Sequence, residues 1–508
     1  MWLLSIIFIV FAGVFVKYRK SRSSEFDRLP STPDLSAAYL LFTGVDIAKI
    51  LDQCYLSPMN PGGIAKTYIK GNAGLLVSKV EYFKHVLTNT SSYISYRLLL
   101  RSLSEFMFVE MFPKIPILTA PHALVNKLLG NNIVFSNGKD WRLRRDVINQ
   151  QFRMGWEPDR FSSSVLDFFE CVDSMESVPD LYHIMELMTL DTLGKVLFGF
   201  HFEALRKPEG EYISTYFKAI KAAFNVLYIA IPILDRFPTP GRTKGHLAVK
   251  EFRDLLGTLA IAKSKEIENQ LNDPEKIPSD LLTVLVQSWL DKRLTFEEII
   301  DEMVTLIIAG HDTTANTLSC ALYLLAEQSE IQTKAREEIN SIFEGHTSTV
   351  DIPSSDQIKS LHYLEAIIKE TLRLYPPTPI LLTHAAAENT RIGNIAIPKG
   401  TLINLNFYAM HRCEEYWDEP NLFKPDRWLS PEGTVKNLPS WGPFSDGIRT
   451  CIGKSFAMAE MKIALSMIVR RYYLTLPETS SGESGLQFEA EMIFKAKNLH
   501  LQFTKISD

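Results

Sequence analysis

The chain has 508 residues, of which 46% are hydrophobic and 22% are charged, so it has the composition of a globular protein with ample apolar material for a core. Its net charge of −5 gives no reason to expect a nucleic-acid partner. The five cysteines are scattered without C-x-x-C spacing, which argues against a disulfide framework and a zinc site and suits a reducing, cytosol-facing compartment.

The first segment of the chain, Met1 to Val16, is apolar and uncharged, and Lys17, Arg19 and Lys20 follow it at once. We expect a single-pass transmembrane anchor at 1–16, with the basic flank and the rest of the chain on the cytosolic side. The segment is slightly shorter than the roughly 17 to 25 residues of a spanning helix. The alternative is a cleaved signal peptide, but that requires basic residues before the apolar run, not after it.

A basic and proline-containing linker is predicted at 17–34, where Pro30 and Pro33 stiffen the backbone. From there to the end no long Pro/Gly/Ser stretch or shift in composition divides the chain. Although the length alone would suggest several domains, we therefore expect one domain at 35–508. Helical patterns dominate in it, so the predicted fold class is mainly α with small β-sheets.

One predicted helix is unusually long. Thr295 and Glu298 have the spacing of a capping box, and apolar positions continue to Glu327 without a proline. A helix of about 33 residues would be roughly 50 Å long, enough to cross the whole domain.

Shorter elements are predicted near the C-terminal third of the chain. A helix should hold Leu361 to Tyr375, because Pro376-Pro377 stops it. Alternating apolar runs at Ile392 to Pro398 and Thr401 to Leu405 predict small strands.

A cysteine lies in a glycine-punctuated loop with the sequence Phe444-Ser445-Asp446-Gly447-Ile448-Arg449-Thr450-Cys451-Ile452-Gly453. Gly447 and Gly453 let the backbone turn closely enough to aim N–H donors at a sulfur ligand of heme iron. Cys451 would be the axial ligand, Arg449 would reach a heme propionate, and Phe444 would keep water off the sulfur. The alternative is a buried free cysteine in a turn, which leaves the five matched positions of F-x-x-G-x-R-x-C-x-G unexplained.

On these residues the chain resembles the cytochrome P-450 superfamily, and the resemblance covers most of the chain from Val77 onward. It implies the cytochrome P-450 fold, a heme b cofactor with an axial thiolate, and monooxygenase activity. The stretch Leu197-Phe198-Gly199-Phe200-His201-Phe202 is similar to fungal microsomal members. The expected location is therefore the endoplasmic reticulum membrane.

Within the long helix, Ala309-Gly310-His311-Asp312-Thr313-Thr314 matches the family's A-G-x-D-T-T stretch. The resemblance implies that Ala309 and Gly310 leave room for heme and dioxygen, and that Asp312 and Thr313 are catalytic and relay protons. The alternative is a threonine bonded back to a helix carbonyl and an aspartate that faces solvent. We expect His311 to be a satisfied helix histidine and not a metal ligand.

Glu370 and Arg373 lie three residues apart and share a helix face. The resemblance adds Arg427 as a third member of a structural network that fixes the loop around Cys451. The alternative is an ordinary exposed pair, which would contribute little to stability.

Further contacts to the heme propionates are expected from Trp141 and Arg145, which reproduce the family's W-x-x-x-R, and from His384, where the family usually has an arginine. Because imidazole is charged only when protonated, a contact from His384 should weaken as the pH rises. The alternatives are that Trp141 and Arg145 merely stack on a helix surface and that His384 points elsewhere.

The resemblance implies electrons from NADPH–cytochrome P-450 reductase, with cytochrome b5 as a second candidate donor. The chain itself has no G-x-G-x-x-G segment for a dinucleotide. The candidates for a basic face that docks the acidic reductase are Lys139, Arg142, Arg144 and Lys454, which lie near the heme motifs in the sequence. A solvated basic face without a partner is the alternative.

The resemblance implies that the roof of the substrate pocket comes from residues 88–129, about 203–244, 378–382 and 491–494. The predicted substrate is a lipophilic or aromatic small molecule, because these segments are apolar and include Phe217, Phe224, Tyr228 and Phe494. Two other functions remain open. A heme-thiolate isomerase or peroxygenase would not need protons from Asp312 and Thr313. A non-catalytic heme-binding sensor would not consume NADPH in response to substrate.

Overall fold

The computed structural model describes residues 29–31, 46–56, 62–69, 72–88, 122–175, 178, 180–225, 228–229, 232–270, 280–343, 348, 350–429, 440–477, 485–490 and 493–506. The predicted anchor at 1–16 and nearly all of the predicted linker lie outside these residues. Within the described part of the chain, no helix is long and apolar enough to cross a membrane.

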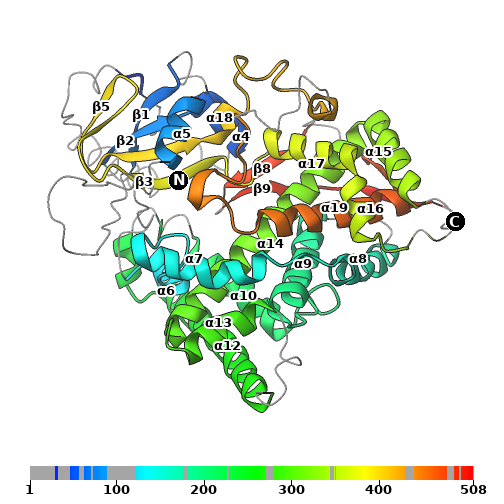
Figure 1. Cartoon of the computed structure of the whole chain (residues 1–508), viewed down its shortest axis with the longest axis horizontal. Coiled ribbons are helices and arrows are strands. Elements are labelled where there is room, and N and C mark those ends of the chain that lie inside the picture. The colour runs from blue at the N-terminus through cyan, green and yellow to red at the C-terminus, as the bar shows by residue number, and fades with distance from the viewer. Residues whose placement is uncertain are drawn as a thin grey trace, which may run out of the picture.

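Helices form most of the described fold, as predicted (Figure 1). Their bounds are α4 Ile47–Ile50, α5 Val80–Thr88, α6 Leu124–Leu129, α7 Gly138–Phe152, α8 Pro158–Asp173, α9 Leu181–Leu193, α10 Glu211–Ala223, α12 Pro240–Asn269, α13 Leu281–Leu290, α14 Phe296–Glu327, α15 Ser329–Ile342, α16 Ser355–Ser360, α17 His362–Leu374, α18 Phe407–Met410 and α19 Lys454–Arg471.

The long helix α14 confirms the prediction and runs through the middle of the molecule (Figure 1). Its N-terminus is the predicted capping box: the backbone N–H of Glu298 donates to Thr295 Oγ1 at 3.3 Å, and the backbone N–H of Thr295 donates to Glu298 Oε2 at 2.8 Å. Helices α9, α17 and α19 pack against it. The helix α17 also confirms its prediction, since it ends at Leu374, just before the two prolines.

The strands form small sheets beside the helices. Their bounds are β1 Ile64–Ile69, β2 Asn72–Val77, β3 Ile380–Ala385, β4 Thr390–Ile392, β5 Ile395–Ile397, β6 Leu402–Asn406, β7 Tyr472–Thr475, β8 Gln487–Ala490, β9 Phe494–Lys497 and β10 Gln502–Lys505. One sheet has the order β1-β2-β6-β3, in which only the β2–β6 pair is parallel. The other three are two-stranded and antiparallel.

Two strand predictions have different outcomes. The strand expected at 401–405 is β6, shifted by one residue. The strand expected at 392–398 is present only as β5 at 395–397, because the chain turns at Gly393, whose φ is 55°, and forms the hairpin of β4 and β5. A glycine adopts this positive φ without the steric cost that other residues meet.

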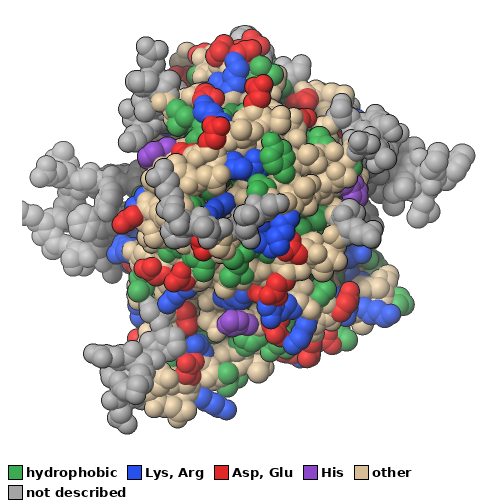
Figure 2. Space-filling model, turned by 90° about the vertical axis from the view of Figure 1, so that its right-hand side faces the viewer, with side chains coloured by type: hydrophobic (Ala, Val, Ile, Leu, Met, Phe, Trp, Pro, Cys, Tyr) green, Lys and Arg blue, Asp and Glu red, His purple; other side chains and the backbone are tan. Residues whose placement is uncertain are grey.

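The described apolar residues form one large buried cluster and smaller ones. The large cluster joins α8, α9, α14, α17 and α19, and a second cluster lies between the four-stranded sheet and α5. Charges of both signs are mixed on the face shown in Figure 2, in keeping with the small net charge. The helical core therefore holds the segments that carry the predicted site residues.

Candidate functional site

The cysteine loop has a backbone held by its own hydrogen bonds. The N–H of Cys451 donates to Phe444 O at 2.9 Å, and the N–H of Thr450 donates to Gly447 O at 3.1 Å. Gly447 has a φ of 68°, and a Cβ at this position would lie 2.8 Å from Leu87 O of α5. The turn therefore requires glycine at this position. The N–H of Gly447 itself donates to Asp446 Oδ1 at 2.7 Å and not to the sulfur.

The surroundings of the Cys451 sulfur have two opposing effects on its charge. Burial raises the pKa of the Cys451 thiol, whereas a hydrogen bond from the Gly453 N–H and the positive charges of Arg145 and Lys454 lower it. These groups stabilise a thiolate, which is the form that binds a metal. Cys451 as a residue is nevertheless exposed. A soft anionic sulfur ligand with an N–H donor and nearby cations fits heme iron.

The structure brings Trp141, Arg145 and Arg449 together beside this loop. The guanidinium of Arg449 lies 4.1 Å from the ring centroid of Trp141, and its Nη2 donates to Ser136 O at 2.9 Å. Arg145 Nη1 donates to Thr450 O at 3.0 Å, so helix α7 contacts the residue next to Cys451. Burial lowers the pKa of Arg145, and the charge of Cys451 partly opposes this. Two arginines and an indole thus lie beside the cysteine loop, where they could hold the anionic propionates of a heme.

Phe444 packs beside an aromatic ring and a lysine, whereas His384 is buried in a strand. The ring of Phe444 lies 6.2 Å from that of Trp441, and Lys454 Nζ lies 5.8 Å from the Phe444 centroid. His384 is buried in β3, opposite Ile403 of β6, next to an irregularity in the strand register after Leu381. The predicted propionate contact of His384 stays a prediction.

The expectation that Arg144 belongs to an exposed basic face is wrong. Its side chain is 0% exposed and pairs with Asp140 at 3.0 Å, Glu298 at 2.6 Å and Glu302 at 2.9 Å. The physical reason is the position of Arg144 on α7, which directs its side chain toward Glu298 and Glu302 of α14. Burial raises the pKa of Glu302 to about 7, although Arg144 opposes the shift. Of the other candidates, Lys139 and Lys454 are exposed and Arg142 is half-buried.

Helix α14 is buried almost throughout its length but has an accessible patch near its centre. Ala309 is exposed and Thr313, one turn later, is half-buried. Side chains four residues apart lie on the same helix face. The expectation that Gly310 leaves room for heme is not met, because a Cβ at Gly310 would collide with Leu193 of α9. Gly310 instead allows α9 to pack closely against α14.

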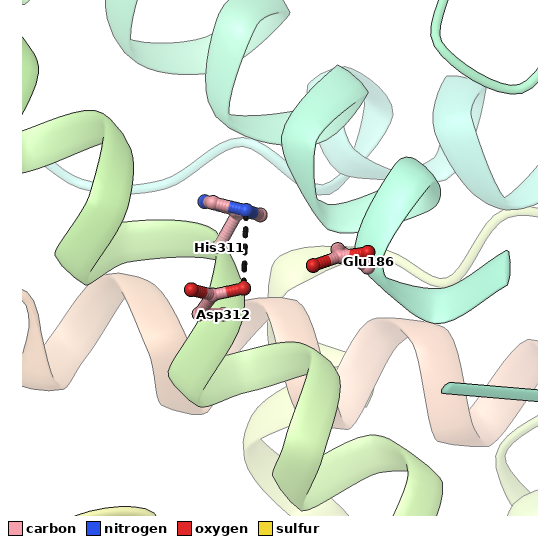
Figure 3. Close-up of side chains that lie close together, drawn as sticks. All are labelled: Glu186, His311 and Asp312. Atoms are coloured by element: carbon pink, nitrogen blue, oxygen red, sulfur yellow. Dashed lines mark ion pairs between the residues drawn. The ribbon is translucent and has the colours of Figure 1, made fainter. Parts of the chain in front are cut away.

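The predicted catalytic pair takes two different arrangements. Thr313 Oγ1 donates to Ala309 O at 3.0 Å, which is the bond back to the helix that the sequence left open as an alternative. Asp312 does not simply face solvent, since its Oδ1 lies 3.2 Å from His311 Nε2 and 3.4 Å from the Tyr182 hydroxyl, which donates to it. Figure 3 shows Asp312 beside His311, with Glu186 of α9 facing both.

His311 is a satisfied buried histidine, as predicted. Its Nδ1 lies 2.7 Å from Ile307 O, one turn earlier on α14, and its Nε2 lies 3.1 Å from the Tyr216 hydroxyl of α10. Burial opposes its protonation, but the adjacent Asp312 raises the pKa of His311 above its ordinary value.

Glu370, Arg373 and Arg427 are brought together in a buried network. Arg373 donates through Nε to Glu370 Oε2 at 2.9 Å and through Nη2 to Oε1 at 2.8 Å, and Arg427 Nε donates to Oε1 at 3.0 Å. The indole N–H of Trp428 also donates to Glu370 at 2.9 Å. Burial acts to raise the pKa of Glu370, but these donors hold it below its usual value. The alternative of an exposed pair is therefore not met.

Sequence reasoning missed His411, which connects this network to the cysteine loop. Its Nδ1 lies 3.1 Å from Arg373 O, and its Nε2 accepts the N–H of Gly442, two residues before Phe444, at 3.3 Å. Arg373 Nη1 donates to His411 O at 2.8 Å. Burial and the charge of Arg373 lower the pKa of His411 to about 3, so it is neutral. No spacing in the sequence joins three segments this far apart.

Two aromatic residues expected over the substrate pocket are engaged in packing. The rings of Phe494 and Phe488 stack at 3.9 Å, and Phe494 is 1% exposed. The Arg242 guanidinium lies 4.0 Å from the Tyr228 centroid. Most of the segment expected to form the pocket roof between Thr88 and Leu129 lies outside the described residues.

The comparisons with known proteins agree with this geometry. A family model described as Cytochrome P450 matches residues 119–503. Cytochrome P450 4A14 of Rattus norvegicus is 30% identical over 396 residues, which cover 74% of this chain and 76% of that protein. Cytochrome P450 monooxygenase 128 of Postia placenta is 27% identical over 518 residues, covering 86% and 90%. The crystal structure of the cytochrome P450DA heme domain shares the fold, with a TM-score of 0.76 and 20% identity over 94% of this chain and 98% of that one.

Proposed function

The chain belongs to the cytochrome P450 family of heme-thiolate monooxygenases, and on that premise we propose that it hydroxylates a lipophilic or aromatic small molecule with electrons from NADPH–cytochrome P-450 reductase. The overall reaction would be R–H + O₂ + NADPH + H⁺ → R–OH + NADP⁺ + H₂O. The observation that carries the proposal is the Cys451 loop, where an N–H donor and two cations surround the sulfur of an exposed residue.

The heme, when bound, supplies the activation of dioxygen. In the proposal Cys451 ligates its iron from the loop, while Trp141, Arg145, Arg449 and His384 hold the propionates. The proximity of Arg145 and Arg449 to the loop supports this assignment, because arginine binds carboxylates through charge-assisted hydrogen bonds.

Asp312 and Thr313 would supply the protons that the reaction consumes. The accessible patch of α14 at Ala309 and Thr313 supports a role for this turn at the reacting centre. The Thr313 hydroxyl donates a hydrogen bond to Ala309 O, so its oxygen keeps lone pairs that can accept a hydrogen bond. A need for protons favours a monooxygenase over an isomerase or peroxygenase.

The proposed setting is the endoplasmic reticulum membrane, with the anchor at 1–16, the linker at 17–34 and a cytosolic domain at 35–508. The exposed Lys139 and Lys454 support docking of an acidic reductase, with cytochrome b5 as a second donor. Arg144 takes no part in this surface.

The experiment is reconstitution of the heme-loaded protein with the reductase and NADPH. A panel of lipophilic and aromatic compounds is first screened by the change in heme spin state, and the compound with the largest shift is used for turnover. We expect Asp312→Asn to slow turnover by about 100-fold, the lower end for general acid–base catalysis, and Thr313→Ala to release more peroxide per NADPH.

Three results would count against the proposal. An unchanged ratio of product formed to NADPH consumed in both variants would contradict the proton relay. Product formation without NADPH would favour an isomerase. A heme spectrum without substrate-stimulated NADPH consumption, for any compound that shifts the spin state, would favour a sensor.

A further inference from the structure

A short chain of titratable side chains leads from the surface to Asp312. His183 and Glu186 lie one turn apart on α9, and His183 Nδ1 is 3.2 Å from Glu186 Oε2. The His183 side chain is 48% exposed, whereas that of Glu186 is only 7% exposed. The pair therefore spans the boundary between solvent and the interior.

Glu186 continues this chain inward to α14. A carboxylate oxygen of Glu186, a carboxylate oxygen of Asp312 and a ring nitrogen of His311 lie within 4.8 Å of one another. In Figure 3 the Glu186 side chain extends from α9 toward Asp312. Two carboxyl groups can share a hydrogen bond only when one of them holds a proton, so this placement suits the passage of a proton from Glu186 to Asp312.

The neighbouring charges favour the protonated form of His183 at the surface and the ionised form of Asp312 in the interior. The hydrogen bond to Glu186 raises the pKa of His183, burial and Lys495 oppose the shift, and Asp180 supports it. Burial acts to raise the pKa of Asp312, but the charge and hydrogen bond of His311 and the charge of Lys495 outweigh it and lower the pKa. Asp312 therefore stays an anion until a proton is delivered to it.

The groups that face Glu186 come from each element packed around it. Lys495 of β9 has its Nζ 3.9 Å from Glu186 Oε1 and 4.7 Å from the Tyr182 centroid. His311 and Asp312 face it from α14, and the Tyr216 hydroxyl of α10 binds His311.

We propose that His183 and Glu186 form the proton inlet of this enzyme. The His183 imidazolium gives its Nδ1 proton to the Glu186 carboxylate, Glu186 passes a proton to the Asp312 carboxylate, and a hydronium ion of the solvent returns a proton to Nδ1 of the neutral His183. The net change is the transfer of one proton from solvent to Asp312. The inference rests on the proposed role of Asp312 and extends it to two residues that act through Asp312, so both are relay residues and not catalytic ones.

The first test follows the charge of His183 directly and needs no turnover. The pKa of His183 is measured by NMR titration in the parent and in Glu186→Gln. We expect the pKa to fall toward its ordinary value of about 6.5 in the variant, because the carboxylate partner is lost. Glu170→Gln, which removes an exposed acid of α8, is the matched control and should leave the His183 titration unchanged.

The second test is the rate of NADPH oxidation by the reconstituted protein in H₂O and in D₂O, across the pH range that brackets the measured His183 pKa. We expect Glu186→Gln to slow NADPH oxidation by about tenfold and to raise the solvent isotope effect. The rate loss is smaller than that for a group that exchanges protons directly with the reacting atoms. In the parent the rate should fall as pH rises through the His183 pKa, because the imidazolium is the donor. In His183→Gln, this fall in the rate of NADPH oxidation with rising pH should be absent.

The outcomes separate this inference from the proposed function. If Asp312→Asn raises the solvent isotope effect and Glu186→Gln does not, the inlet is wrong and the role of Asp312 stands. If neither variant changes it, both fail. A loss of thermal stability in Glu186→Gln with an unchanged isotope effect would make Glu186 structural. Treating the parent with EDTA is a further control. If EDTA slows NADPH oxidation as much as Glu186→Gln does, these residues bind a cation and the proton inlet is wrong.

Discussion

At the scale of single residues, neighbours decide which protonation state each site residue holds. The Cys451 thiol has a raised pKa because it is buried, yet Gly453, Arg145 and Lys454 favour its anion. His411 is held neutral by burial and by Arg373. The same residue types would behave differently elsewhere in the chain, as Cys320 shows, whose pKa burial raises without any compensating group.

The first prediction concerns the iron ligand. Cys451→Ser should remove the thiolate signature from the ferrous–CO spectrum, because a neutral hydroxyl does not replace an anionic sulfur donor. Cys171→Ser, which changes a half-buried cysteine of α8, is the control and should keep the parent spectrum. A red-shifted Soret band that persisted in Cys451→Ser would show that the ligand is a different residue.

The second prediction concerns acid. The folded pKa of His411 is about 3, below the value of about 6.5 in an unfolded chain. The unfolded state therefore binds more protons between these values, and stability is lost as the pH falls below about 6.5. We expect the free energy of unfolding of the parent to fall by about 1.5 kcal/mol more than that of His411→Gln between about pH 6.5 and pH 5.

Urea denaturation of both proteins at each pH measures this difference. Other groups titrate equally in the two proteins, so the difference isolates His411. Parallel curves would mean that His411 is not the group that makes the fold sensitive to acid.

At the scale of elements, α17 is tied to the chain after α18 by one buried carboxylate. Glu370 accepts bonds from Arg373, Arg427 and Trp428, and Arg373 donates to the backbone of His411 and Pro420. His411 then accepts the N–H of Gly442 at the start of the cysteine loop. The network thus reaches the chain just before the cysteine loop through backbone contacts of His411.

The third prediction ranks the members of this network. Glu370→Gln should cost about 3 to 5 kcal/mol, because it leaves Arg373 buried without its anion. Arg427→Met should cost less, about 1 to 2 kcal/mol, since Arg427 is partly exposed and Glu370 keeps its other donors. Asp356→Asn removes an exposed pair with Lys359 at the same sequence spacing and should change stability by less than about 0.5 kcal/mol. Urea midpoints test this order, and a larger loss in Arg427→Met than in Glu370→Gln would contradict it.

At the scale of the whole molecule, α14 organises the fold. It contacts α9 on the side of the proposed proton inlet and α19 on the side of the cysteine loop. Arg144 connects it to α7, which also carries Trp141 and Arg145. The proposed proton inlet and the cysteine loop therefore both lie beside elements that pack on α14, and α14 is long enough to contact all of them.

The fourth prediction concerns attachment to a membrane. Removing Met1 to Val16 should leave the heme spectrum intact and reduce the share of protein that sediments with membranes, because that segment holds none of the site residues. Full-length protein washed with high salt should remain bound, since a spanning anchor is held by apolar contacts. Its complete release by salt would rule out a spanning anchor.

Several features could be predicted from the sequence because they depend on nearby residues. The capping box at Thr295 and Glu298 and the prolines after Tyr375 define helix ends through contacts of a few residues. The pair of Glu370 and Arg373 is likewise local. The Cys451 loop and the A-G-x-D-T-T stretch depend on fixed spacing, which a single sequence displays directly.

Tertiary structure alone decided which way the remaining side chains face and what they meet. The sequence by itself determined the mainly helical fold, the long central helix and the cysteine loop, but it left Arg144 among exposed bases and did not single out His411 or Glu186. Arg144 and Glu302 are 158 residues apart, and Arg145 meets Thr450 across 305 residues. Such contacts arise when helices pack and bury polar groups that must then find partners. No local periodicity encodes them, because each partner is set by the packing of the whole chain.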